Sequence, residues 1–173
     1  MSERKAAECS GFTERLRRFL LPEINRRLLI RLLLIVLIAV TFFSVFKPCF
    51  VSGSSMEPTF GNNRISFSFR LSYLVSPPRR GDVVTIAFFG RKELLKRVVA
   101  LPGDTVSFHN GKLVLNGEII DEPYLKKECN WDLSAVTVRP GHCFVVGDNR
   151  SQSHLEHRFG EVEIKRITGE VLF

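Results

Sequence analysis

The apolar residues of this chain are distributed in two contrasting ways. Residues 28–46 read LLIRLLLIVLIAVTFFSVF, which is apolar on every face of a helix apart from Arg31 near its start. At ~1.5 Å per residue this run extends roughly 28 Å, close to the hydrocarbon thickness of a bilayer. The sequence therefore predicts a transmembrane anchor at residues 24–47, with Arg31 extending its charge towards the headgroups.

The same run has two alternative interpretations, a helix buried in a soluble core and a cleaved signal sequence. It is too long for the apolar region of a signal peptide, and no small-x-small cleavage site follows it. Both observations favour the anchor.

After Lys47-Pro48 the apolar residues occur only in short runs, which are separated by turn dipeptides such as Pro-Gly and Asn-Gly. Runs of four to eight residues rich in Val, Ile and Phe are typical of antiparallel strands. Asn110-Gly111 predicts a hairpin that joins TVSFH to KLVLN. We therefore expect residues 48–173 to form one all-β domain of antiparallel strands. The runs are RISFSF, DVVTIAFF, KRVVAL, TVSFHN, KLVLNG, CFVVGD and ITGEVLF.

The charge distribution predicts the orientation of the anchor. The formal net charge is +7, and residues 1–31 hold eight Lys or Arg against four Glu. Such a basic arm can bind nucleic acid or lie on the cytoplasmic side of a membrane, and the apolar run beside it favours the membrane. Residues 1–23 are thus expected to be a cytoplasmic basic tail, with the β domain on the extracytoplasmic side of a bacterial cytoplasmic membrane.

The four cysteines predict no metal site. Cys9 precedes the anchor and is expected to stay reduced, while Cys49, Cys129 and Cys143 follow it. A bridge between Cys129 and Cys143 remains open at this stage. No CxxC pair is present, and we find no metal or nucleotide motif and expect no cofactor.

Ser55, in the segment VSGSSMEPTF, is a candidate nucleophile. Glycine permits unusual backbone angles there, and neighbouring N–H groups can stabilise an anion. The alternative is an ordinary serine-rich turn. A reactive serine also needs a base, and the histidines at positions 109, 142, 154 and 157 show no triad-like pattern with an aspartate.

Lys96 is the other candidate base, because it opens the apolar run KRVVAL. A free lysine has a pKa near ~10.4 and keeps its proton. Burial in apolar surroundings lowers that pKa by up to ~3–5 units, which makes a neutral amine available. The alternative is a solvated lysine on an edge strand.

Four sequence blocks occur in an order that resembles bacterial type I signal peptidase, the serine–lysine protease that removes signal peptides from exported proteins. The resemblance covers nearly the whole chain and implies a signal-peptidase-like coiled β fold. The blocks are SGSSMEPT at 52–59, RRGDVV at 79–84, KRVVALPGDTV at 96–106 followed by NGKLVLNGE at 110–118, and GDNRSQS at 147–153.

The resemblance also implies roles for single residues. Ser55 would be the nucleophile and Lys96 the general base, with the Ser55 N–H in the oxyanion hole. Gly53 stands where some members carry a serine that adds a second donor, and Ser153 would orient the lysine. Asp148 and Arg150 are expected to organise the turn that contains them.

The segment after Ser153 departs from the pattern of the family, which usually shows Asp-Ser-Arg one residue further on. Counting from Ser153 places Leu155 and His157 at the acid and base positions. Counting back from Phe159-Gly160 places Glu156 and Arg158 there, and we prefer this second alignment because it keeps an acid–base pair.

The resemblance implies a signal peptide bound as an extended strand, with small residues in an Ala-x-Ala pattern before the cleaved bond. Val51, Met56 and Leu95 are expected to line the small pockets. The phenylalanine-rich runs suggest a face that meets the lipid bilayer, and neither nucleic acid nor metal is an expected partner. The rival interpretations are a maturation protease for one pilus or conjugation protein, a self-cleaving repressor-type protease and an inert membrane-tethered β scaffold.

Overall fold

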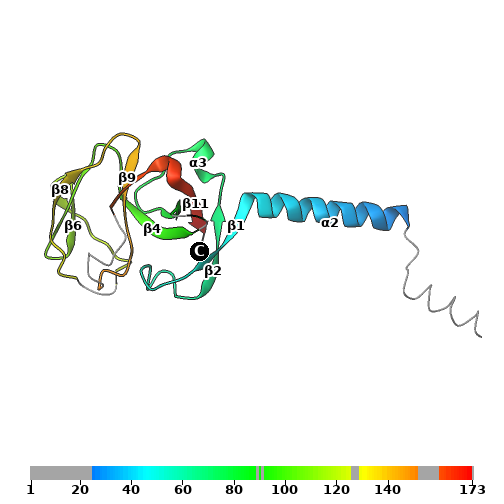
Figure 1. The fold of residues 1–173 in the computed structure, drawn as a ribbon, viewed down its shortest axis with the longest axis horizontal. Coiled ribbons are helices and arrows are strands. Elements are labelled where there is room, and N and C mark those ends of the chain that lie inside the picture. Colours follow the sequence, from blue (N-terminus) through cyan, green and yellow to red (C-terminus); the bar gives the residue numbers. More distant parts are fainter. Residues whose placement is uncertain (1–24, 89, 91, 126–128, 152–159, 173) are drawn as a thin grey trace, which may run out of the picture. The chain divides into compact units, whose positions relative to one another are not determined.

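The computed structural model describes residues 25–88, 90, 92–125, 129–151 and 160–172 and divides the chain into two units, residues 1–42 and 43–173. The apolar run forms helix α2, Arg26–Val45, whose 20 residues have no buried side chain (Figure 1). Leu33 and Ile38 are each 68% exposed. In length and composition α2 is a candidate membrane span, as predicted. The basic tail at residues 1–23 lies outside the described residues.

The second unit consists of two antiparallel sheets, which confirms the all-β prediction (Figure 1). The larger sheet has the order β1 (Phe46–Val51), β2 (Arg64–Phe69), β11 (Ile167–Leu172), β3 (Val83–Ala87), β4 (Glu93–Ala100), β9 (His142–Val146) and β10 (Gly160–Glu163). The smaller has the order β7 (Glu118–Ile119), β6 (Lys112–Leu115), β5 (Thr105–His109) and β8 (Leu133–Thr137). Two short helices, α3 (Ser72–Val75) and η1 (Ile164–Arg166), complete the described elements.

The predicted runs correspond to β2, β3, β4, β5, β6, β9 and β11. The Asn110-Gly111 hairpin is confirmed, since His109 pairs with Lys112 across it. Strand β1 is not among the predicted runs, because Lys47 and Pro48 interrupt its apolar pattern. It pairs with β2 along its whole length, and as the edge strand of the larger sheet it tolerates a proline.

The larger sheet buries apolar residues on both of its faces, as the two-residue alternation of strands requires. Val84 and Ile86 of β3 pack with Val145 of β9 in one cluster. Val83, the residue before Val84, belongs to a cluster on the other face with Met56. The second cluster anchors the loop that carries Ser55.

The smaller sheet has its own core. Phe108 and Trp131 meet edge to face with ring centroids 5.7 Å apart, and both are buried. Cys129 packs against this core, and its thiol donates to the Gly111 carbonyl. Cys143 lies fully buried on β9 instead, so the bridge between Cys129 and Cys143 is not formed.

Two glycines of the smaller sheet allow a test of its turn geometry. Gly111 and Gly117 both have a positive φ, +76° and +89°, but a Cβ on Gly111 would collide with the Cys129 carbonyl group, whereas the space beside Gly117 is open. We expect Gly117→Ala to lower the free energy of unfolding by about 1 kcal/mol, the cost of the left-handed backbone alone. Gly111→Ala should lower it by about 3 kcal/mol, because the collision adds to that cost.

Urea-induced unfolding of the full chain in detergent measures the free energy of unfolding of both variants. Equal losses in the two would contradict the close approach of Cys129 to this turn.

Candidate active site

Ser55 lies in the loop that connects β1 to β2. Met56 is buried directly after it, and Gly53 before it has a φ of +102°. The side-chain carbonyl of Asn62 accepts a hydrogen bond from the Gly53 N–H at 2.9 Å, and the Asn63 N–H donates to the Val51 carbonyl at 2.9 Å. The loop is therefore closed on itself and leaves Ser55 half-buried.

The turn at residues 147–150 holds this loop from a second direction. The backbone N–H of Asn149 donates to the Ser55 carbonyl at 2.9 Å, and the Asn149 side-chain amide donates to the Ser54 carbonyl at 3.0 Å. The Thr59 hydroxyl donates to the Asp148 carboxylate at 2.6 Å. Three hydrogen bonds thus fix the backbone on both sides of the candidate nucleophile.

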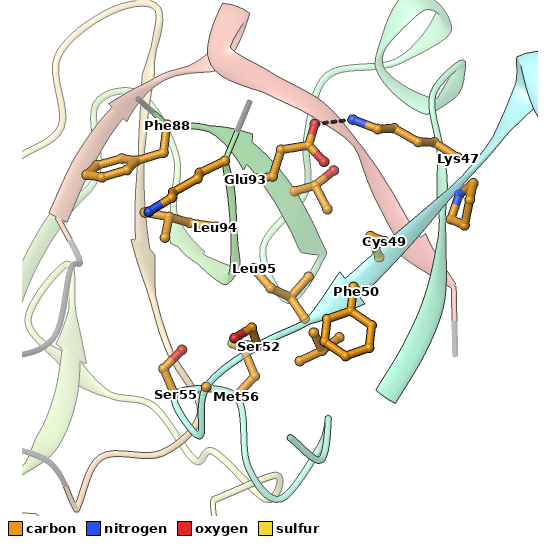
Figure 2. Close-up of a pocket in the computed structure, with 15 residues that line it drawn as sticks. Lys47, Cys49, Phe50, Ser52, Ser55, Met56, Phe88, Glu93, Leu94 and Leu95 are labelled. Atoms are coloured by element: carbon orange, nitrogen blue, oxygen red, sulfur yellow. Dashed lines mark hydrogen bonds and ion pairs between the residues drawn. The ribbon is translucent and has the colours of Figure 1, made fainter. Parts of the chain in front are cut away.

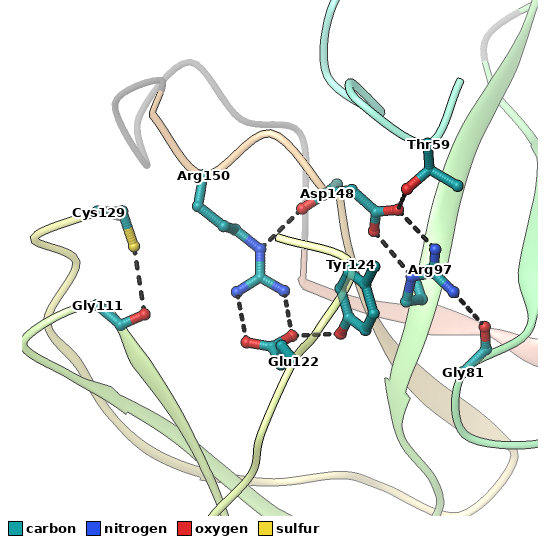
Figure 3. Close-up of polar contacts among 10 residues, drawn as sticks. Thr59, Gly81, Arg97, Gly111, Glu122, Tyr124, Cys129, Asp148 and Arg150 are labelled. Carbon is teal, nitrogen blue, oxygen red and sulfur yellow. Dashed lines mark hydrogen bonds and ion pairs between the residues drawn. The ribbon is translucent and has the colours of Figure 1, made fainter. Parts of the chain in front are cut away.

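Two buried arginines stabilise the turn at residues 147–150 (Figure 3). Arg97 of β4 binds the Asp148 carboxylate with two nitrogens at 2.8 and 2.6 Å and donates to the Gly81 carbonyl at 2.7 Å. Arg150 binds Glu122 in the same two-pronged manner. The expected role of Asp148 and Arg150 in organising this turn agrees with these contacts.

A groove of about 570 Å³ passes the Ser55 side chain (Figure 2). Its walls come from β1 and β4. Val51, Met56 and Leu95, which we expected to line the substrate pockets, line this groove together with Ser55. At the end away from Ser55, Lys47 and Glu93 form an ion pair of 2.7 Å between the two walls.

Lys96 is buried, with 3% of its surface exposed. Burial lowers the pKa of its amine to about 8, and the negative charge of Asp148 opposes that shift. The side chain lines a small, mainly apolar cavity of about 140 Å³. Phe88 and Leu94 line both this cavity and the groove, so the two spaces adjoin.

Within the described residues, no hydrogen bond joins Lys96 to Ser55. Catalytic hydrogen bonds are often long in a free enzyme and tighten when the substrate binds. The structure therefore places a half-buried serine in the groove and a buried amine of lowered pKa in a separate small cavity, and the two spaces share Phe88 and Leu94 in their linings.

The structure describes only some of the other residues that the sequence singled out. Gly53 lines the groove beside Ser55. Ser153 and the two alignments of residues 154–158 lie outside the described residues. Of the histidines, His109 is exposed at the hairpin, and the His142 ring lies 3.0 Å from the Pro140 carbonyl. No group of three or more His, Cys, Asp or Glu side chains suited to a metal occurs in the described part of the chain.

Sequence reasoning did not identify Asn149 and Glu122 as parts of the site. Asn149 belongs to the Gly-Asp-Asn-Arg block, and its place in that block was the one feature of the sequence that could have indicated its contacts. Glu122 follows a two-residue strand in a different part of the chain, and no pattern in the sequence marks it.

Comparisons with known proteins identify the family to which this chain belongs. A family profile described as signal peptidase, peptidase S26, matches residues 24–173. A signal peptidase I of Bacillus caldolyticus is 36% identical over 143 residues, covering 75% of this chain and 79% of the relative. A probable signal peptidase I-1 of Synechocystis sp. is 34% identical over 143 residues, covering 76% and 71%.

The chain is therefore a serine-peptidase relative with an N-terminal apolar helix, and it belongs to the signal peptidase family, peptidase S26. A solved signal peptidase I structure from Enterococcus faecalis V583 is 28% identical, with a TM-score of 0.47 over 56% of this chain and 98% of the other. Membership rests on the sequence matches.

The buried amine should make the protein less stable at neutral pH. Because the pKa of Lys96 falls from 10.5 to about 8 on folding, the unfolded chain binds more protons between these values, so the free energy of unfolding rises with pH across this window. Replacing the amine by the thioether chain of Lys96→Met should stabilise the protein by about 3 kcal/mol below pH 8, a gain that disappears towards pH 10.5.

Chemical denaturation of the full chain in detergent at pH 7 and pH 10.5 measures this difference. Lys112→Met, which removes an exposed amine from β6, is the control and should leave the pH dependence unchanged. A wild-type slope in Lys96→Met would contradict the burial of a titrating amine.

Proposed function

We propose that this protein is a membrane-anchored signal peptidase I that cleaves exported preproteins after an Ala-x-Ala pattern, with Ser55 as nucleophile and Lys96 as general base. One observation carries the assignment of the dyad, the buried amine of lowered pKa in a cavity that adjoins the groove of Ser55. Membership of the signal peptidase family supports the choice of substrate.

The groove accommodates an extended peptide. Strand β1 is an edge strand, so its free edge offers backbone N–H and C=O groups to an added strand. Val51, Met56 and Leu95 provide apolar surface beside Ser55 for the residue that precedes the cleaved bond. In this position the peptide carbonyl lies next to the serine hydroxyl.

The chemistry then transfers two protons through Lys96, one in each half of the reaction. Neutral Lys96 accepts the Ser55 proton as the serine oxygen attacks the carbonyl carbon, and the Ser55 N–H stabilises the oxyanion. The lysine gives this proton to the leaving amine, and an ester remains on Ser55. Lys96 then accepts a proton from a water molecule as the water oxygen attacks that ester. The lysine passes this proton to the Ser55 oxygen as the ester bond breaks, and the signal peptide leaves with a free carboxyl group.

Helix α2 would attach the protein to the membrane. The arginine-rich tail places residues 1–23 in the cytoplasm under the positive-inside rule, and residues 48–173 on the other side. A mature domain outside the cytoplasm meets signal peptides where they leave the membrane.

An exposed apolar face of the larger sheet supports contact with lipid. Phe50 is paired with Ile65, and Phe67 is paired with both Pro48 and Leu172, so these side chains point to the same side. Phe50 and Ile65 are 64% and 68% exposed. An apolar face of this kind on the protein surface favours partial insertion into the bilayer.

The dyad predicts a specific pH profile. kcat/KM on an Ala-x-Ala peptide should rise about tenfold per pH unit below pH 8 and level off above it, as Lys96 loses its proton. Ser55→Ala and Lys96→Met should each lower kcat by about 10³-fold or more while the fold persists. Steady-state assays of the full chain in detergent measure both effects.

Lys112→Met serves as the control and should behave as wild type. If Lys96→Met kept a near-normal kcat while His154→Ala did not, the lysine would not be the base.

The lipid-facing sheet predicts a difference between two substrates. Ile65→Ser combined with Phe67→Ser should slow cleavage of a vesicle-bound preprotein about fivefold or more, because less apolar surface enters the bilayer. Cleavage of a short soluble peptide in detergent should not change. Ile119→Ser combined with Val136→Ser removes exposed apolar residues from the smaller sheet and is the matched control. Equal slowing in both double variants would argue against a specific lipid face.

A further inference from the structure

A buried network connects the smaller sheet to the loop of Ser55 (Figure 3). Glu122 follows β7 of the smaller sheet, and its carboxylate binds Arg150 through two nitrogens at 3.2 and 2.6 Å. The side chains of Arg150 and Glu122 are 0% and 4% exposed. Removing the carboxylate would leave the guanidinium buried without its counter-charge.

The guanidinium of Arg150 has little freedom to move. Its Nε donates to the Gly147 carbonyl at 2.8 Å, across the turn that it ends. The aromatic rings of Phe108 and Trp131 lie 5.3 and 5.7 Å from its central carbon. The smaller sheet thus supplies both the carboxylate and the aromatic surface that hold Arg150.

Tyr124 joins this pair to the other buried pair. Its hydroxyl donates to Glu122, and its ring lies 4.0 Å from the central carbon of Arg97. Burial and the Glu122 charge raise the pKa of Tyr124, so the hydroxyl keeps the proton that it donates. Arg97 in turn binds Asp148, and the network is closed around the turn at residues 147–150.

We propose that Glu122 is a positioning residue for the hydrolytic site, because it fixes the turn whose Asn149 holds the carbonyls of Ser54 and Ser55. The inference rests on the proposed function of Ser55. Asp148 and Arg150 flank Asn149, and each is held by a separate buried partner, so both ends of the turn are fixed. Without Glu122 the Arg150 end keeps only its bond to Gly147 within the same turn and its aromatic contacts, and the two hydrogen bonds from Asn149 loosen.

A loosened Asn149 affects rate more than binding. The groove is lined by β1, β4 and the Ser55 loop, and in the described residues no hydrogen bond or ion pair joins either strand to Glu122. The Ser55 hydroxyl, however, must meet the peptide carbonyl within a narrow range of positions, and a displacement of about 1 Å costs up to ~10²-fold in rate. The effect of Glu122 should therefore appear in kcat.

The test uses Glu122→Gln in the full chain, since the amide keeps the shape of the side chain and loses its charge. We expect kcat to fall about tenfold on the Ala-x-Ala peptide while KM stays within about twofold. In hydrogen exchange measured by mass spectrometry, the amides of residues 52–60 should exchange faster than in the wild type. This second measurement does not depend on cleavage.

Asp104→Asn is the matched control. It weakens a two-pronged pair with Arg80 that is more exposed, at 49% and 10%. In the described residues neither side chain of this pair forms a hydrogen bond to the Ser55 loop or to residues 147–150. It should leave kcat and the exchange of residues 52–60 unchanged, whatever it does to the melting temperature.

A second variant separates positioning from folding. Glu122→Leu combined with Arg150→Met replaces the ion pair by apolar side chains and should restore the melting temperature without restoring kcat. The proposal is overturned if kcat recovers together with stability, or if Glu122→Gln shows wild-type kcat and exchange. A wild-type protein that fails to cleave the peptide would instead overturn the proposed function, and the exchange result would still stand for or against Glu122.

Discussion

The structure depends on how buried charges are compensated. A guanidinium removed from water must be given a counter-charge and hydrogen-bond acceptors, or the fold loses several kcal/mol. Arg97 and Arg150 meet this requirement with carboxylates from distant segments, Asp148 from the turn after β9 and Glu122 from the segment after β7. Since each acceptor has to be in place, the two pairs fix β4, the smaller sheet and the turn relative to one another. The position of the Ser55 loop depends on that arrangement, because the loop is hydrogen-bonded to the turn.

Lys96 is the contrasting case, a buried amine to which the described residues give no ion pair. The same desolvation that favours carboxylate partners for the arginines lowers the pKa of this amine to about 8. Asp148, whose negative charge favours the protonated form of Lys96, is bound by the neighbouring Arg97 through two nitrogens. Adjacent residues of one strand therefore differ: Arg97 has a buried counter-charge, and Lys96 has a lowered pKa.

Much of the fold follows from short-range patterns. Period-two apolar runs and the Asn110-Gly111 turn predict strands and a hairpin because these depend on neighbouring residues alone. Strand β1 was not predicted, because Lys47 and Pro48 interrupt its apolar pattern. Its pairing with β2, which the local sequence does not reveal, makes it a strand. The candidates Ser55 and Lys96 came from a family resemblance together with the physics of burial. Glu122 escaped because its partner is 28 residues away, and only the folded chain brings the two side chains together.

The free edge of β1 exposes the protein to edge-to-edge aggregation, which the sequence has to prevent. An edge that accepts a peptide can also accept the same edge of a second molecule, and long unbroken edges lead to aggregation. Pro48 removes one backbone donor from the middle of the strand, and proline in a sheet leaves its missing N–H on the unpaired side. An added strand can therefore form only a few backbone hydrogen bonds with β1. A short, interrupted edge of this kind favours brief pairing with an added strand and disfavours permanent association between copies of the protein.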